Sequence, residues 1–169
     1  MEGDGAGQAI ARRTPAGQGR QTLGSPGAAG KLPGRSGVNG TNGYLLDSHG
    51  LLWWWFEPQG LSQTVASLLQ DSHIPVHVSA ARVWELSLRH HRGRLTQLAG
   101  AIGELEQLLQ ADGFRALAIT PAHGLRACAY SQAHHDPVDR LLLAQAEREG
   151  LLLLTADTQL AAFPCQILW

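Results

Sequence analysis

Apolar and polar positions follow two alternating patterns from Tyr44 onward. Short runs that are almost wholly apolar are separated by longer stretches in which apolar residues recur at helical spacing. The short runs predict buried strands and the periodic stretches predict helices. An alternation of this kind is typical of βα units around a mostly parallel sheet. The pattern therefore predicts an α/β fold, and no internal repeat interrupts it.

The apolar runs predict five short strands. The run Leu151 to Leu154 is apolar at every position, which is typical of the centre of a parallel sheet. The expected strands are about Gly43 to Asp47, Val76 to Ser79, Phe114 to Ile119, Leu151 to Leu154, and Cys165 to Leu168.

The periodic stretches predict helices with recognisable ends. Thr120-Pro121 and Asp136-Pro137 each combine an N-cap residue with proline at the first helical position, and Gly150 is placed to end the second of these helices. The segment from Leu98 to Gly113 is expected to form one amphipathic helix. The other expected helices are Ser48 to Phe56, Ser62 to Gln70, about Ala81 to His91, and a short one from about Thr158 to Phe163.

The first 43 residues have a different composition from the rest of the chain. They contain 12 of the 20 glycines and three of the eight prolines, with few large apolar side chains. Such a segment buries too little surface to offset its ordering entropy, so we expect a disordered tail. An alternative is a start-site artefact, with the true protein beginning near Val38. The arginines hint at a transit peptide, but the amphipathic pattern of one is missing, as is the apolar core of a secretory signal.

Charge is distributed unevenly. Residues 1–43 carry five basic and two acidic side chains, a net charge of +3, so the remainder carries −4 because the whole chain has −1. An acidic domain does not hold nucleic acid by bulk electrostatics and needs a metal ion or a local arginine cluster for a phosphate substrate. Cys128 and Cys165 lack metal-type spacing, which favours a reducing compartment and two small buried side chains.

Four acidic residues occupy related places in the predicted fold. Asp47 ends the first strand, Asp157 follows the apolar strand LLLL, Asp139 lies in the first turn of a helix, and Glu85 lies within another helix. The carboxyl ends of parallel strands meet at one edge of a sheet, where α/β folds place their sites. These positions therefore predict a divalent-metal site.

Each acid also has a structural explanation. Asp47 and Asp157 are placed to cap the helices that follow them, and Asp139 in the first turn favours the helix dipole. Glu85 lies three and four residues from Arg82 and Arg89, which is suitable for ion pairs on an exposed face. The occurrence of all four acids together favours the metal site over four independent structural roles.

The chemistry of the cluster is consistent with Mg²⁺ or Mn²⁺. These hard cations prefer oxygen ligands and keep several waters, so a few carboxylates suffice without histidine or cysteine. A bound ion orients water and neutralises charge on a phosphodiester in the transition state. Without a cation, four neighbouring carboxylates would repel one another.

Four segments resemble the PIN-domain ribonucleases, and in particular the VapC-type toxins of bacterial toxin–antitoxin pairs: YLLDSHGLLWW, VSAARVWELSLRHHRGRL, HHDPVDRLLLAQA and LLLLTADTQLAAFPCQILW. The resemblance runs from about Tyr44 to Trp169. It implies a three-layer α/β/α fold with a mostly parallel sheet. It also implies Mg²⁺- or Mn²⁺-dependent endoribonuclease activity and a cognate antitoxin in the active-site groove. A cytoplasmic location without a membrane anchor is expected from the two cysteines and from the lack of a stretch long enough to span a bilayer. The long N-terminal segment departs from the family and favours the start-site artefact.

The resemblance also implies roles for individual residues. The catalytic acids would be Asp47, Glu85, Asp139 and Asp157. Asp47 and Asp139 are expected as principal metal ligands, with Asp157 and Glu85 binding directly or through water. Secondary candidates are Asp136 at the edge of the site, His49 beside the metal, and Arg82 and Arg89 for phosphates.

Loop histidines and consecutive tryptophans are the remaining notable features. His134 and His135 precede the Asp136 cap; solvated loop histidines are the favoured interpretation, and a role in proton transfer is the alternative. Trp53, Trp54 and Trp55 fan over roughly 200° of a helix, so at least one is expected to face a homodimer partner or the antitoxin unless a loop covers it.

Two other function classes are weighed against a metal-dependent nuclease. A PIN-like module that binds RNA or protein without turnover is disfavoured by the intact acids. An enzyme with Asp47 as phosphoacceptor would want a late lysine, but the chain has none after Lys31. A dinucleotide-binding fold lacks its glycine-rich turn after the first strand.

Overall fold

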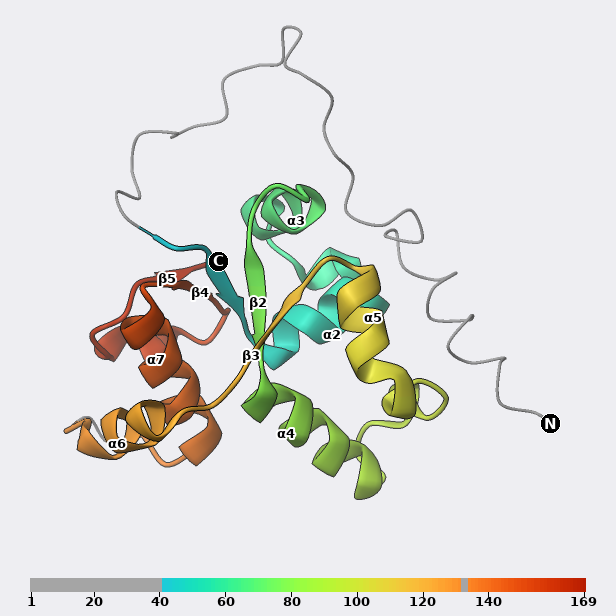
Figure 1. The fold of residues 1–169 in the computed structure, drawn as a ribbon. Helices are drawn as coiled ribbons and strands as arrows, with labels where there is room; N and C mark the ends of the chain where they lie inside the picture. Colours follow the sequence, from blue (N-terminus) through green and yellow to red (C-terminus); the bar gives the residue numbers. More distant parts are fainter. Residues whose placement is uncertain (1–40, 132–133) are drawn as a thin grey trace, which may run out of the picture.

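The computed structural model describes residues 41–131 and 134–169, so the predictions for residues 1–40 lie outside the described part of the chain. In the described part, five parallel strands form one sheet in the order β3-β2-β1-β4-β5 (Figure 1). The strands are β1 Tyr44–Leu46, β2 Val76–Ser79, β3 Arg115–Leu117, β4 Leu152–Leu154 and β5 Ile167–Leu168. The predicted parallel sheet is confirmed.

Helices cover both faces of this sheet. In Figure 1, α2, α3 and α5 lie on one side of the strands and α6 and α7 on the other, while α4 continues from the end of β2. The helices are α2 Ser48–Phe56, α3 Gln63–Gln70, α4 Ala80–His91, α5 Leu105–Ala111, α6 Pro121–Ala129 and α7 Pro137–Glu149. The molecule is therefore a three-layer α/β/α fold, as expected.

Two hydrophobic cores lie on opposite faces of the sheet. Successive strand residues point to opposite faces. Leu46 and Leu154 accordingly belong to the core beneath α2, α3 and α5, whereas Leu45 and Leu153 belong to the core beneath α7. Burial on both faces explains why the strand LLLL has no polar alternation.

Several elements have the boundaries that the sequence predicted. Helix α2 spans Ser48–Phe56, and α7 begins after the Asp136 cap and ends at Gly150, whose φ of 65° is left-handed. Helix α6 begins after Thr120, whose side chain accepts a hydrogen bond from the backbone of His123. Capping chemistry at these positions is local, so the sequence alone determines it.

The helix expected between Leu98 and Gly113 is wrong in extent. Only Leu105–Ala111 is α-helical, and two 3₁₀ turns, Thr96–Leu98 and Ile102–Glu104, precede it. Glycine at positions 100 and 103 lowers helix propensity in the first half of the segment. The apolar spacing is nevertheless used, since Leu98, Leu105 and Leu109 are all buried in one core.

The short helix expected from about Thr158 is present as a 3₁₀ helix, Thr158–Ala162. The burial expected of the two cysteines needs correction. The cysteines are free, but Cys128 is exposed and Cys165 is half-buried, so they are not a pair of buried side chains. Partial burial raises the pKa of the Cys165 thiol to about 11.

The three consecutive tryptophans point to different surroundings. Trp54 and Trp55 are buried, and both indole nitrogens donate to Oδ2 of Asp112, at 3.1 and 2.8 Å. Trp53 lies apart from them with its ring 5.2 Å from that of Trp169. The three indoles therefore do point in different directions, and a protein partner that covers Trp53 stays a prediction. None of the helices in the described segments is both long and apolar enough to cross a membrane.

Candidate active site

Asp47 lies immediately after β1 and begins α2. Its Oδ1 accepts a hydrogen bond from the backbone N–H of Ser48 at 2.5 Å, and its Oδ2 accepts one from Oγ1 of Thr155 at 2.9 Å. Thr155 follows β4, which pairs with β1, so adjacent strand ends bring the two side chains together. Asp47 is therefore a helix cap, and its carboxylate is also buried at the carboxyl edge of the sheet.

Arg82 occupies the centre of the acidic cluster. It lies in the first turn of α4, and its side chain is only 3% exposed. Its NH2 group lies 2.9 Å from Oδ1 of Asp47 and 2.5 Å from Oδ1 of Asp139, and its NH1 group lies 2.8 Å from Oε2 of Glu85. One guanidinium thus joins carboxylates from the end of β1, from α4 and from α7.

Glu85 is more enclosed than an ion pair on an exposed face would require. Its side chain is 22% exposed, and Oε2 also accepts a hydrogen bond from Oγ of Ser48 at 3.3 Å. Arg89 is the weaker partner, with NH1 at 3.7 Å from Oε1. The i,i+3 pair with Arg82 therefore turns Glu85 toward the end of β1.

Asp139 is held from two sides. Arg82 contacts Oδ1, and Nε2 of His134 lies 2.8 Å from Oδ2. The His134 side chain is 12% exposed, so its expected solvation is wrong; its neighbour His135 is exposed. Asp136 is also exposed, and its Oδ1 accepts the backbone N–H of Val138 at 2.8 Å as the cap of α7.

Asp157 stands at the edge of the cluster. Its Oδ1 accepts the backbone N–H of Gln159 at 2.9 Å, and its own N–H donates to Oγ1 of Thr155 at 3.1 Å. Thr155 in turn bonds Asp47, so Asp157 is connected to the centre through one hydroxyl. Three of the predicted acids thus contact the guanidinium of Arg82, and the fourth, Asp157, is the cap of the 3₁₀ turn that follows it.

Electrostatics keep the centre charged. Burial by itself would raise the pKa of Asp47. The neighbouring His49, the Arg82 charge and the Thr155 hydroxyl outweigh burial and lower that pKa to about 2. Burial likewise opposes the charged form of Arg82, but the three carboxylates overcome it and raise the pKa of its guanidinium.

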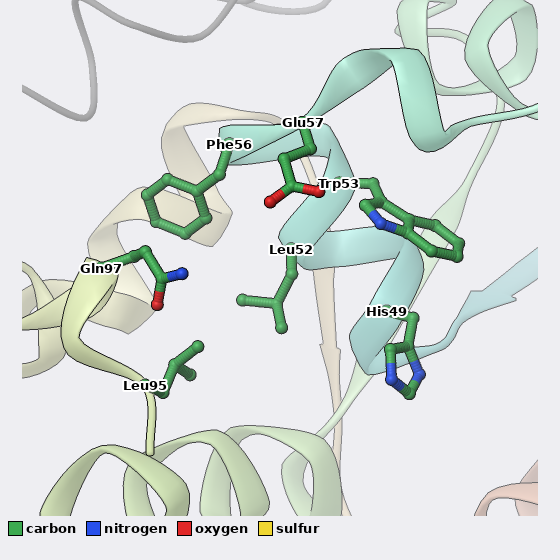
Figure 2. A pocket seen from close by; sticks show the side chains of 7 residues that line it. All are labelled: His49, Leu52, Trp53, Phe56, Glu57, Leu95 and Gln97. Carbon is green, nitrogen blue, oxygen red and sulfur yellow. The ribbon is translucent and has the colours of Figure 1, made fainter. Parts of the chain in front are cut away.

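His49 lies at the solvent side of the cluster. Its side chain is 60% exposed, and Nδ1 is 3.8 Å from Oδ2 of Asp47. The Asp47 carboxylate raises the pKa of His49 above its usual value, so the imidazolium is favoured beside the site. His49 also lines a hollow along α2 with Leu52, Trp53 and Phe56 (Figure 2).

Sequence reasoning missed three features of this site. Thr155 directly follows a predicted strand, so its position at the carboxyl edge was a usable signal. His134 depends on how the loop before α7 turns, which local pattern does not determine. Arg82 was expected to contact phosphates, whereas it lies among the carboxylates because the start of α4 points into the sheet edge.

The donor set has the right chemistry for a hard divalent cation. Asp47, Glu85 and Asp139 each place an oxygen within 2.9 Å of the same positive group. Such oxygen ligands suit Mg²⁺ or Mn²⁺. Across residues 41–131 and 134–169, no group of three or more aspartate, glutamate, histidine or cysteine side chains is arranged so that it could hold a metal ion. The three carboxylates converge on the guanidinium of Arg82.

Comparison with known proteins agrees with this fold. The family model of the PIN domain matches residues 44–164, which is most of the chain. The chain therefore belongs to the PIN domain family, as the motifs around the four acids predicted.

Two individual proteins illustrate the relationship. The chain is 34% identical over 117 residues to Ribonuclease VapC22 of Mycobacterium tuberculosis (strain ATCC 25618 / H37Rv), an alignment that covers 69% of this chain and 88% of that protein. It is also similar in fold to a chain in the crystal structure of VapBC2 from Rickettsia felis bound to a DNA fragment from their promoter. That match has a TM-score of 0.57 and 12% identity and covers 74% of this chain and 96% of the other.

Proposed function

We propose that this protein is a metal-dependent endoribonuclease that hydrolyses RNA phosphodiesters, and that it is the toxin of a toxin–antitoxin pair. The observation that carries the proposal is the convergence of Asp47, Glu85 and Asp139 on one cationic position at the carboxyl edge of the sheet. The relationship to a protein named as a ribonuclease supports the choice of RNA as substrate.

The acids would have different roles at this centre. Asp47 and Asp139 would hold Mg²⁺ or Mn²⁺, with Glu85 as a third ligand. Asp157, linked to the centre through Thr155, would contribute through water. The bound ion supplies charge neutralisation at the phosphodiester and lowers the pKa of an attacking water.

Cationic side chains around the acids would receive the RNA backbone. Arg89 is 35% exposed beside Glu85, and His49 is 60% exposed beside Asp47. Phosphate contacts of this kind position a nucleic acid without reading its sequence. His49 and Arg89 are thus proposed to orient the scissile phosphate toward the acidic centre.

A protein antitoxin is proposed to cover the hollow along α2. Leu52, Trp53 and Phe56 give it an apolar lining, and His49 at one end joins it to the candidate active site (Figure 2). An apolar segment of an antitoxin placed there would block access to Asp47. Trp53→Ala is expected to weaken binding of the cognate antitoxin, whereas the exposed Leu125 on α6 provides a control, Leu125→Ala.

We further propose a homodimer in the cytoplasm. Trp84 on α4 is 59% exposed, and large exposed aromatic side chains are common interface anchors. A cytoplasmic location is where a nuclease of this kind meets its RNA.

Cleavage of RNA by the purified full chain tests the proposed activity. Total RNA and transfer RNA would be incubated with Mg²⁺, with Mn²⁺ and with EDTA, using wild type and Asp47→Asn. Cleavage that requires metal and is lost in the variant, while circular dichroism shows an intact fold, is the expected result. Full metal-dependent cleavage by Asp47→Asn would refute the assignment of this site.

A non-catalytic binding module is the second candidate, because Arg82 already occupies the centre of the acids. An arginine that never leaves would exclude the ion and leave a surface that binds RNA or protein only. Binding of RNA by wild type without cleavage under any metal condition would favour this alternative.

A further inference from the structure

We infer that Arg82 is an internal counter-ion of the acidic centre, which holds the three carboxylates together in the metal-free protein and competes directly with the divalent ion for them. The inference rests on the proposed metal-dependent function and concerns how that site is regulated. The affinity for metal is therefore expected to depend on the free energy that is needed to displace Arg82 from the carboxylates.

Geometry makes Arg82 and a shared ion mutually exclusive. A single nitrogen, NH2, contacts one oxygen of Asp47 and one oxygen of Asp139 at 2.9 and 2.5 Å. Metal–oxygen distances for Mg²⁺ are about 2 Å, so an ion bridging the same two oxygens would occupy the space beside that nitrogen. Arg82 must therefore move before Asp47 and Asp139 share an ion.

Charge explains why the arginine is there and why an ion would replace it. Three carboxylates face the guanidinium of Arg82, and Arg89 is a more distant second cation at 3.7 Å from Glu85, so the carboxylates outnumber the arginines. Clustered carboxylates without a cation repel one another. One guanidinium reduces this repulsion, and a divalent ion would reduce it further.

Arg82 is bound incompletely. Its Nε atom is buried without a hydrogen-bond partner in the described part of the chain, although NH1 and NH2 are paired. A buried donor that is left unpaired opposes the buried conformation. The unpaired Nε therefore offsets part of the stabilisation that the NH1 and NH2 contacts provide, which favours release of the side chain when another cation arrives.

Metal-binding titrations of the full chain test the competition. Mn²⁺ binding would be followed by electron paramagnetic resonance and by calorimetry for wild type, Arg82→Ala and Arg89→Ala. Both variants remove one positive charge from α4 near Glu85, but only Arg82 contacts the carboxylate oxygens of Asp47 and Asp139. Arg82→Ala is expected to bind Mn²⁺ about tenfold or more tightly than wild type, whereas Arg89→Ala stays close to wild type.

Thermal unfolding provides a second readout. EDTA is expected to lower the melting temperature of wild type less than that of Arg82→Ala, because Arg82 offsets part of the charge of the acids. Arg82→Ala should melt lower in EDTA and recover with Mn²⁺. If Arg82→Ala does not fold in EDTA, Arg82→Gln, which keeps a polar group of intermediate length, takes its place in both measurements.

Two results would overturn the inference: equal Mn²⁺ affinity of wild type and the folded Arg82 variant, or weaker binding by the variant. The test is separate from the nuclease proposal. Tighter Mn²⁺ binding by Arg82→Ala with no RNA cleavage by wild type would keep the competition and reject the nuclease. Metal-dependent cleavage by wild type with unchanged Mn²⁺ affinity in the variant would keep the nuclease and reject the competition.

Discussion

At the scale of single residues, Asp112 shows how one buried acid organises a core. It follows α5 and accepts hydrogen bonds from the indoles of Trp54 and Trp55. Indole N–H groups need a partner when they are buried. The acid thus fixes two large rings of α2 against the end of α5.

Replacement of Asp112 by alanine should therefore destabilise the whole protein. Two buried indole donors would lose this acceptor, at a cost of about 2–4 kcal/mol in the free energy of unfolding. Urea denaturation followed by tryptophan fluorescence measures this cost. Glu106→Ala, at an exposed position of α5, serves as the control and should change stability little; equal stability of the two variants would contradict the role of Asp112.

Individual residues also show what the sequence could and could not predict about the site. Asp47, Asp139 and Asp157 could be predicted because they follow strands or lie in the first turn of a helix, which is local information, whereas Glu85 lies within α4. The place of Arg82 depends on the distance between α4 and α7, which no local pattern contains. Asp157 has two predicted roles for one carboxylate: the role as cap is confirmed, and the role as metal ligand stays a prediction.

At the scale of elements, glycine has opposite effects in α6 and after α7. Gly150 has a φ of 65°, where an added Cβ would lie 3.1 Å from Nδ2 of Asn42. Gly124 lies inside α6 with open space around its Cβ position. Only Gly150 uses the conformational freedom of glycine.

The two alanine substitutions should accordingly change stability in opposite directions. Gly150→Ala forces alanine into the left-handed region and is expected to cost about 1 kcal/mol. Gly124→Ala improves helix propensity and is expected to add about 0.5–1 kcal/mol to stability. Chemical denaturation of both variants measures the difference. A destabilised Gly124→Ala together with a neutral Gly150→Ala would show that the local account is wrong.

A charged contact joins α6 to α7. Both Nε and NH2 of Arg126 donate to Glu147, at 2.8 and 2.9 Å, and the hydroxyl of Tyr130 donates to the same carboxylate at 2.7 Å. The hydrogen bonds from Arg126 are the largest cause that lowers the pKa of Glu147 below its usual value. The contact is thus favoured by the ionised form of Glu147.

Stability from this contact should depend on pH. A carboxyl with a lowered pKa in the folded protein stabilises it above the unfolded pKa, near 4.5, and loses this effect as pH falls through the folded pKa. Glu147→Gln should therefore lower the melting temperature at pH 7 but differ less from wild type below pH 4. A difference that stays constant from pH 7 to pH 3 would exclude this linkage.

Elements with strong local signals were predicted to within a few residues. Helix α2 was predicted to the residue, because Asp47 caps its start and Glu57-Pro58 closes it. The segment before α5 was not, because its leucines have helical spacing while its glycines interrupt the helix. Apolar spacing determines which side chains are buried, but the backbone conformation there depends on packing against α2 and α4.

At the scale of the whole molecule, the parallel sheet has a structural and a chemical role. Its two faces bury separate cores, and its carboxyl edge collects Asp47, Ser79 and Thr155 from neighbouring strands (Figure 1). The order β3-β2-β1-β4-β5 places β1 in the middle. Asp47 therefore lies where helices from both layers can reach it.

The proposed homodimer makes a prediction at this scale. Trp84 on α4 and Leu125 on α6 are 59% and 75% exposed. Sedimentation velocity of the full chain is expected to show a dimer for wild type and for Leu125→Ala, and a shift toward monomer for Trp84→Ala. A monomeric wild type at micromolar concentration would reject the dimer.

Asp47, Glu85 and Asp139 are proposed as the metal centre of this PIN-domain protein. Anomalous diffraction from crystals of the full chain soaked in Mn²⁺ would locate the bound ion. We expect a strong peak about 2 Å from oxygens of Asp47 and Asp139, with Glu85 beside it. A peak that lies elsewhere, or saturating Mn²⁺ without any peak at these three carboxylates, would refute this assignment.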